Sequence, residues 1–274
     1  MAHLFEKTYW AMSRTKRLFP SLVALLVIGL GTGVYLRSDH YFNGEKAAKI
    51  DLSVIEITLK CLSADSIETV RNSGSIDVLI PRCSHELREV LGDEFQSVSE
   101  GAFRAILATV LAANFAEYGA SSAQSYEEIK NSSHLDCSRT ILLVGYLLDA
   151  LESQRLQPIG FDGGYIGNHA QLLFNDERDT ILLDPTAGII AKTSFNDLLR
   201  GVPLDEKSIR AFSMKDKSIN SFRENVYTAI SHGKYLPSDL MYMHESLAEQ
   251  KMGGSDFYFT PGGITVRSKF KNQN

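Results

Sequence analysis

The sequence lacks the features by which most metal-binding and nucleic-acid-binding proteins are recognised. Its 274 residues include three cysteines and one tryptophan, and no Cys-x-x-Cys or His-Glu-x-x-His motif. Zinc centres of the common structural and protease types are therefore not expected. The net charge of −5 offers no basic patch for nucleic acid. We expect no metal, no cofactor and no nucleic-acid partner.

Charge is also absent from one long stretch near the amino end. Residues 18–36 contain no charged side chain and are long enough to cross a hydrocarbon layer of about 30 Å. Basic residues precede this stretch, namely Lys7, Arg14, Lys16 and Arg17. The positive-inside tendency therefore places residues 1–17 in the cytoplasm and the chain after about residue 37 outside it, which is the periplasm in a Gram-negative cell.

A cleaved signal peptide is the alternative interpretation of this stretch. However, the apolar run is longer than the usual signal-peptide core of about 7–15 residues. No Ala-x-Ala cleavage site follows it. The sequence therefore predicts an uncleaved signal anchor, a single transmembrane helix that keeps the protein in the membrane.

The chain after the anchor is long enough for one sizeable globular domain. We divide the chain into a cytoplasmic tail at 1–17, an anchor at 18–36, a linker and N-terminal elaboration at 37–95, a core at 96–192 and a C-terminal elaboration at 193–274. Apolar residues at helical spacing predict a core helix within 101–118. A short strand is predicted at 75–80, and two strands around a Pro-Gly-Gly turn at 257–266.

Cys137 is the cysteine with the most informative context. Asp136 is a candidate N-cap, and apolar residues at helical spacing extend from there to Leu151. Cys137 therefore falls in the first turn of a buried helix, where unpaired N–H groups and the helix dipole favour the thiolate. The other two cysteines, Cys61 and Cys83, either form a disulfide outside the cytoplasm or remain buried free thiols.

His169 and Asp184 lie on a predicted antiparallel hairpin. Two short apolar runs flank a polar turn, a pattern that is typical of such hairpins. In a register that pairs Phe174 with Asp179, His169 lies opposite Asp184 and both side chains leave the same face of the sheet. Together with Cys137, they would supply a nucleophile, its base and the group that orients the base.

These residues and their neighbours resemble the transglutaminase-like superfamily of cysteine hydrolases and acyltransferases. The stretches that carry the resemblance are Asp-Cys-Ser-Arg at 136–139, Gly-Asn-His-Ala-Gln-Leu at 167–172 and Leu-Leu-Asp-Pro-Thr at 182–186. The resemblance covers about residues 126–190. It implies an α+β, papain-like fold in which a helix bearing the Cys packs on an antiparallel sheet bearing the His and Asp. It also implies Cys137 as nucleophile, His169 as general base and acid, and Asp184 as the group that fixes the imidazole tautomer.

The sequence departs from this family at Gln171, because an aromatic residue commonly follows His-Ala there. Three residues are candidates for stabilising an oxyanion or contacting substrate: Gln124 through its carboxamide, Ser138 through its backbone N–H, and Gln171. Zinc is a further alternative, because His134, Cys137, His169 and Asp184 are residue types that can ligate it.

The sequence thus predicts a membrane-anchored, extracytoplasmic thiol enzyme with a Cys-His-Asp triad. It would act on amide or acyl bonds of peptides, proteins or envelope glycopolymers through an acyl-enzyme that water or an amine resolves. The alternative is a catalytically degenerate copy of the fold that serves as a binding or assembly component of an envelope or polysaccharide-handling complex. The two hypotheses differ in the reactivity they predict for the Cys137 thiol.

Overall fold

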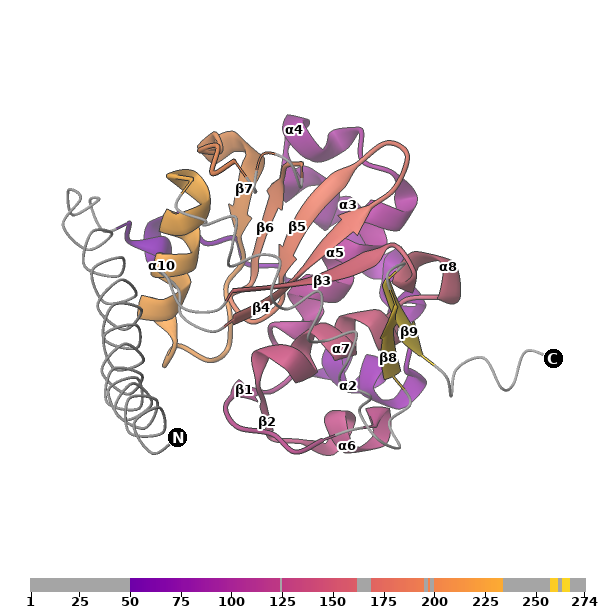
Figure 1. Ribbon diagram of the computed structural model, residues 1–274. Coiled ribbons are helices and arrows are strands. Elements are labelled where there is room, and N and C mark those ends of the chain that lie inside the picture. The colour runs from indigo at the N-terminus through magenta and orange to yellow at the C-terminus, as the bar shows by residue number, and fades with distance from the viewer. Residues whose placement is uncertain are drawn as a thin grey trace, which may run out of the picture. The chain divides into compact units, whose positions relative to one another are not determined.

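A five-stranded antiparallel sheet is the centre of the protein in the computed structural model (Figure 1). The structure describes residues 50–123, 125–161, 169–194, 197, 200–233, 257–260 and 263–266. The strands follow one another across the sheet in chain order: β3 (Leu156–Phe161), β4 (His169–Asn175), β5 (Thr180–Asp184), β6 (Ile189–Lys192) and β7 (Ile209–Ala211). The fold is mixed α+β, as predicted.

Helices and short strands occupy the chain on either side of this sheet. The helices are η1 (Leu52–Val54), α2 (Ala64–Ser73), η2 (Ile76–Val78), α3 (Ile80–Leu91), α4 (Asp93–Gln96), α5 (Glu100–Ala112), α6 (Tyr126–Asn131), α7 (Cys137–Leu147), α8 (Ala150–Ser153), η3 (Glu206–Ser208) and α10 (Asn220–Ser231). The short strands β1 (Glu117–Tyr118) and β2 (His134–Leu135) pair in parallel. Strands β8 (Phe257–Thr260) and β9 (Gly263–Val266) form the antiparallel pair predicted at 257–266.

Helices cover both faces of the central sheet (Figure 1). On one face, helices including α3, α5 and α7 pack against Leu172 of β4 and Leu183 of β5. On the other face, α10 packs against Leu173 and Leu182 of the same strands. Because both faces are buried, these strands are nearly continuous apolar runs. The polar side chains of His169, Gln171 and Asp184 on these strands are therefore buried.

Strands β4 and β5 form the predicted hairpin, but the predicted register is wrong by two residues. Leu172 pairs with Leu183, and continuing this register places Gln171, rather than His169, beside Asp184. The shift is even, so all three polar side chains still leave the same face, the one covered by α10. His169 therefore approaches Asp184 as a diagonal neighbour.

The turn between the two strands explains this error. The carboxylate of Asp176 accepts the backbone N–H groups of Arg178 and Asp179 at 2.9 and 2.8 Å. Asp179 itself is buried and accepts the backbone N–H of Ser99 at 2.7 Å. The side chains of both aspartates thus hold the turn and fix Asp179 within it, outside the strand.

Two other local predictions are wrong. Segment 75–80 is not a strand, because Ser75 caps η2 and Pro81 lies in the first turn of α3, where its missing N–H costs no hydrogen bond. The predicted long helix after Asp136 ends at Leu147, and Leu151 is 70% exposed on α8. The predicted core helix within 101–118 is confirmed as α5.

The segment before α5 belongs to the main core. Val70 of α2, Leu87 of α3 and Phe95 of α4 are buried in the same apolar cluster as α5 and α7. The predicted anchor at 18–36 lies outside the described residues. Across the part of the chain that the structure describes, no helix combines the length and the apolar character needed to cross a membrane.

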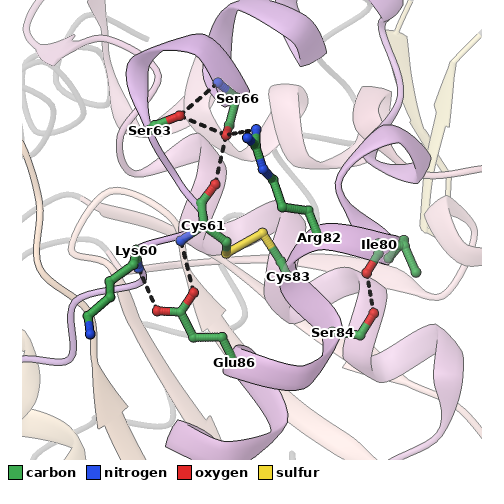
Figure 2. The surroundings of a disulfide bond; sticks show 9 residues. All are labelled: Lys60, Cys61, Ser63, Ser66, Ile80, Arg82, Cys83, Ser84 and Glu86. Carbon is green, nitrogen blue, oxygen red and sulfur yellow. Dashed lines mark hydrogen bonds between the residues drawn. A yellow bond between two sulfur atoms is a disulfide. The ribbon is translucent and has the colours of Figure 1, made fainter.

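A disulfide between Cys61 and Cys83 ties the segment before α2 to α3 (Figure 2). Their Cα atoms are 5.4 Å apart. Next to the bridge, the carboxylate of Glu86 accepts the backbone N–H groups of Lys60 and Cys61 at 2.6 and 2.9 Å. The structure therefore selects the disulfide over two free thiols and leaves Cys137 as the free cysteine.

Removing this bridge is expected to destabilise the protein measurably. A Cys61→Ala/Cys83→Ala variant should lose about 3 kcal/mol of unfolding free energy, because the unfolded chain is no longer constrained by the cross-link. Chemical denaturation without reductant measures the loss. Adding reductant should lower the midpoint of the wild type and leave that of the variant unchanged. Equal midpoints for the two proteins in oxidising buffer would contradict this prediction.

Candidate active site

Cys137 is the first residue of α7, as predicted. Asp136 caps the helix, since its carboxylate accepts the backbone N–H of Arg139 at 2.9 Å. The Cys137 thiol is free and partly buried, and it borders the apolar core. The cap leaves the thiol beside the N-terminal N–H groups of α7, which favour its ionised form.

His169 and Asp184 are in direct contact beneath the surface. The Nε2 atom of His169 lies 2.7 Å from Oδ2 of Asp184, and the two side chains are 1% and 0% exposed. The other carboxylate oxygen, Oδ1, accepts the backbone N–H groups of Thr186 and Ala187 at 3.1 and 2.8 Å. These bonds fix the carboxylate in place. Nε2 of the imidazole is therefore paired with Asp184, and Nδ1 is left for a different partner.

Cys137 and His169 form the second contact of the site. Burial opposes the thiolate, but the hydrogen bond and charge of His169, with the backbone N–H of Ala170, hold the pKa of Cys137 below its ordinary value. Burial also opposes the imidazolium, but the charge and hydrogen bond of Asp184, with a smaller effect of Cys137, raise the pKa of His169 to about 9. Each group therefore favours the charged form of the other, a thiolate beside an imidazolium.

Two aromatic residues that the sequence analysis missed complete this region. The ring of Phe222, on α10, meets the His169 ring edge-on, with centroids 4.8 Å apart and an interplanar angle of 79°. Tyr118 of β1 stacks beside Phe222, with centroids 6.4 Å apart. No motif marks either residue, and the aromatic content of the segment around Phe222 was the only available signal.

The charges of the site also affect the pKa of Tyr118. Burial, followed by the negative charges of Cys137, Asp136 and Asp184, raises the pKa of Tyr118. Its side chain stays partly accessible, since the residue is 41% exposed. The raised pKa keeps the phenol protonated, and therefore a hydrogen-bond donor, at neutral pH.

A buried arginine anchors the start of α10. Arg223 is fully buried, and its guanidinium donates to the backbone carbonyls of Ala187 and Phe212, each at 2.7 Å. It also forms an ion pair and hydrogen bond with the carboxylate of Glu56. Arg223 therefore joins α10 to the turn after Asp184 and to the segment before α2.

Glu56 is held by two cations. Nζ of Lys217 lies 2.9 Å from Oε2 of the Glu56 carboxylate, whereas Arg223 contacts Oε1. Although burial raises it, the pKa of Glu56 is held below its ordinary value by the hydrogen bonds and charges of Lys217 and Arg223. Since Phe222 precedes Arg223 on α10, this network also fixes the ring that covers His169.

The remaining predicted site residues occupy different environments. Gln171 is fully buried and donates to Oδ2 of Asp184 at 2.6 Å, so this amide group serves the carboxylate. Ser138 follows Cys137 in the first turn of α7 and is partly buried. Gln124 lies outside the described residues.

His134 does not join the other candidate zinc ligands. It is exposed on β2, where its ring lies 3.7 Å from Glu117 and 2.9 Å from the hydroxyl of Ser133. Within the described ranges, no group of three or more His, Cys, Asp or Glu side chains is arranged to hold a metal ion. The structure thus brings together Cys137, His169 and Asp184 and places Gln171 against the carboxylate.

Comparisons of the chain with models of protein families, with curated proteins and with solved structures found no match.

Proposed function

We propose that this protein is a thiol enzyme of transglutaminase-like, papain-like architecture that cleaves or transfers acyl groups through a Cys137–His169–Asp184 triad. The observation that carries the proposal is the continuous chain of contacts from a free thiol at a helix N-terminus, through a buried imidazole, to a fully hydrogen-bonded carboxylate. The order of the three residues and their flanking sequence support the same chemistry.

The roles of the residues follow from their contacts. The Cys137 thiolate attacks the carbonyl carbon of an amide or ester and forms a tetrahedral oxyanion. The His169 imidazolium then gives its proton to the leaving amine as the C–N bond breaks, which leaves a thioester on Cys137. His169, now neutral, takes a proton from water or from a second amine as it attacks the thioester, and the thiolate is released. Asp184 holds the imidazole in the required tautomer throughout.

The setting proposed for this reaction is outside the cytoplasm. An uncharged stretch at 18–36 preceded by basic residues supports a single membrane anchor with the globular part on the outer side. The Cys61–Cys83 disulfide is consistent with an oxidising compartment. Peptides, proteins or envelope glycopolymers carrying amide-linked groups are the substrates that such a location makes available.

The test is to trap the acyl-enzyme. The full chain is mixed with an activated nitrophenyl ester, and the released nitrophenolate is followed together with the intact mass of the protein. We expect a burst of about one nitrophenolate per chain and one added acyl group on Cys137, as double-displacement chemistry requires. Adding a primary amine then shows whether the acyl group is transferred or hydrolysed.

Two variants give the result its meaning. Cys137→Ser should remove the burst, and His169→Ala should slow it strongly, whereas His134→Ala, which alters an exposed histidine, should leave it unchanged. Acylation that is absent from the wild type, or that persists at the same rate in His169→Ala, would overturn the proposal. Such a result would favour the degenerate binding module.

A further inference from the structure

The Asp184 carboxylate accepts a hydrogen bond from a side chain outside the triad, in addition to its contact with His169. Its Oδ1 accepts two backbone N–H groups of the following turn. Its Oδ2 accepts His169 Nε2 at 2.7 Å and also Gln171 Nε2 at 2.6 Å. The two side chains therefore share one oxygen atom, and all three residues are buried.

The direction of the Gln171 bond is fixed by charge. The reverse amide orientation would place Oε1 of Gln171 against the ionised Oδ2 of Asp184, which is repulsive, so the nitrogen must face the carboxylate. In this orientation, Oε1 of Gln171 is buried and has no hydrogen-bond partner among the described residues. Leaving a buried acceptor unpaired opposes folding, so an apolar residue would satisfy the core at least as well. The amide is thus explained by its bond to Asp184.

We propose that Gln171 is a positioning residue of this site: by sharing Oδ2 of Asp184 with His169, it limits how strongly the carboxylate holds the imidazole proton. A carboxylate oxygen that already accepts a strong hydrogen bond is a weaker acceptor for the next donor. His169 must release its proton to the leaving amine, so a carboxylate that held it too strongly would slow that step. Gln171 thereby keeps His169 able to act as an acid.

The surroundings of His169 leave few other groups that could have this effect. Asp184 from β5 and Cys137 from α7 are the charged groups that determine its ionisation. From α10, the Phe222 ring contacts the imidazole and carries no charge. Gln171 is therefore the neutral donor that acts on His169 through Asp184.

The inference rests on the proposed function for its purpose, but its test does not need an active enzyme. In the full chain carrying Cys137→Ser, the His169 imidazole is titrated by NMR with and without Gln171→Met, a substitution of similar size without a donor. The pKa of His169 should rise by about one unit when Gln171 is replaced, the size expected for the loss of one hydrogen bond to a charged group.

A matched control separates this effect from general repacking. Leu173 lies two residues further along β4, on the same face and fully buried, and Leu173→Met should leave the titration of His169 unchanged. If Gln171→Met does not fold, Gln171→Leu removes the donor with another apolar side chain and should move the His169 titration upward in the same way. An unchanged or lowered pKa of His169 in the folded variants overturns the inference.

The reaction gives an independent readout in chains that retain Cys137. Gln171→Met should slow acylation by an amide, which needs a proton for its leaving amine, at least about fivefold more than acylation by a nitrophenyl ester, which does not. Equal slowing of both substrates would indicate a structural role for Gln171 and would contradict the inference. If no variant or wild type is acylated, the proposed function fails, and the NMR titration still decides the role of Gln171.

Discussion

Replacing His169 by alanine is expected to slow the alkylation of Cys137 at pH 6 by about tenfold or more. In the wild type, the hydrogen bond and charge of His169 lower the pKa of the thiol, so a larger fraction of Cys137 is ionised at that pH than in the variant. Without it, burial leaves the thiol with a pKa at or above its ordinary value of about 8.5, and little thiolate remains. The difference in alkylation rate between the wild type and the variant is smaller than the difference in thiolate fraction, because a less basic thiolate is a weaker nucleophile.

The shape of the pH profile is as informative as the rate. We expect the wild-type rate to level off at a lower pH than the His169→Ala rate, which should rise by about tenfold per pH unit below its thiol pKa. Iodoacetamide labelling followed by mass spectrometry measures both profiles. The assignment is direct, because Cys61 and Cys83 are bridged and Cys137 is free. Profiles that run parallel would mean that His169 does not control the thiol.

The second large effect is expected on stability. Arg223→Met should lower the free energy of unfolding by about 3–5 kcal/mol, because it breaks a buried ion pair and leaves Glu56 facing the interior with one partner fewer. It also removes the donors to the carbonyls of Ala187 and Phe212. Urea denaturation followed by circular dichroism measures the change.

Two further variants calibrate this loss. Arg88 pairs with Glu100 at 2.9 Å on the surface, and Arg88→Met should cost less than about 1 kcal/mol. Removing both buried charges in Glu56→Leu/Arg223→Met should recover part of the stability, because no unpaired charge is then left inside. A loss for Arg223→Met no larger than that for Arg88→Met would show that the buried contacts contribute little.

Local sequence signals predicted the parts of the site that depend on neighbouring residues. Asp136 and Cys137 were placed correctly at the start of a helix, because a capping side chain and an apolar periodicity are both local features. The hairpin that carries His169 and Asp184 was predicted for the same reason. The Phe257–Val266 strand pair followed from its Pro-Gly-Gly turn.

The parts that the sequence did not predict depend on distant residues. The register of the hairpin is set by a turn whose Asp179 bonds to Ser99, far away in the chain. Phe222 reaches His169 because Arg223 fixes α10 to the sheet, and no local pattern records that contact. In the sequence, Gln171 was only a departure from the aromatic residue expected after His-Ala. Its partner Asp184 lies on the neighbouring strand, so no local pattern predicts their hydrogen bond.

The contact between Glu56 and Arg223 determines how the chain can be shortened for crystallisation or assay. The short segment from Asp51 to Ile57 precedes the first long helix, α2, and contains only the short helix η1. However, Leu52 is buried beside α10, and Ile57 bridges to Phe212 at the edge of the sheet. A recombinant fragment that starts after Ile57 would leave the guanidinium without its carboxylate partner Glu56, so fragments should start no later than Asp51.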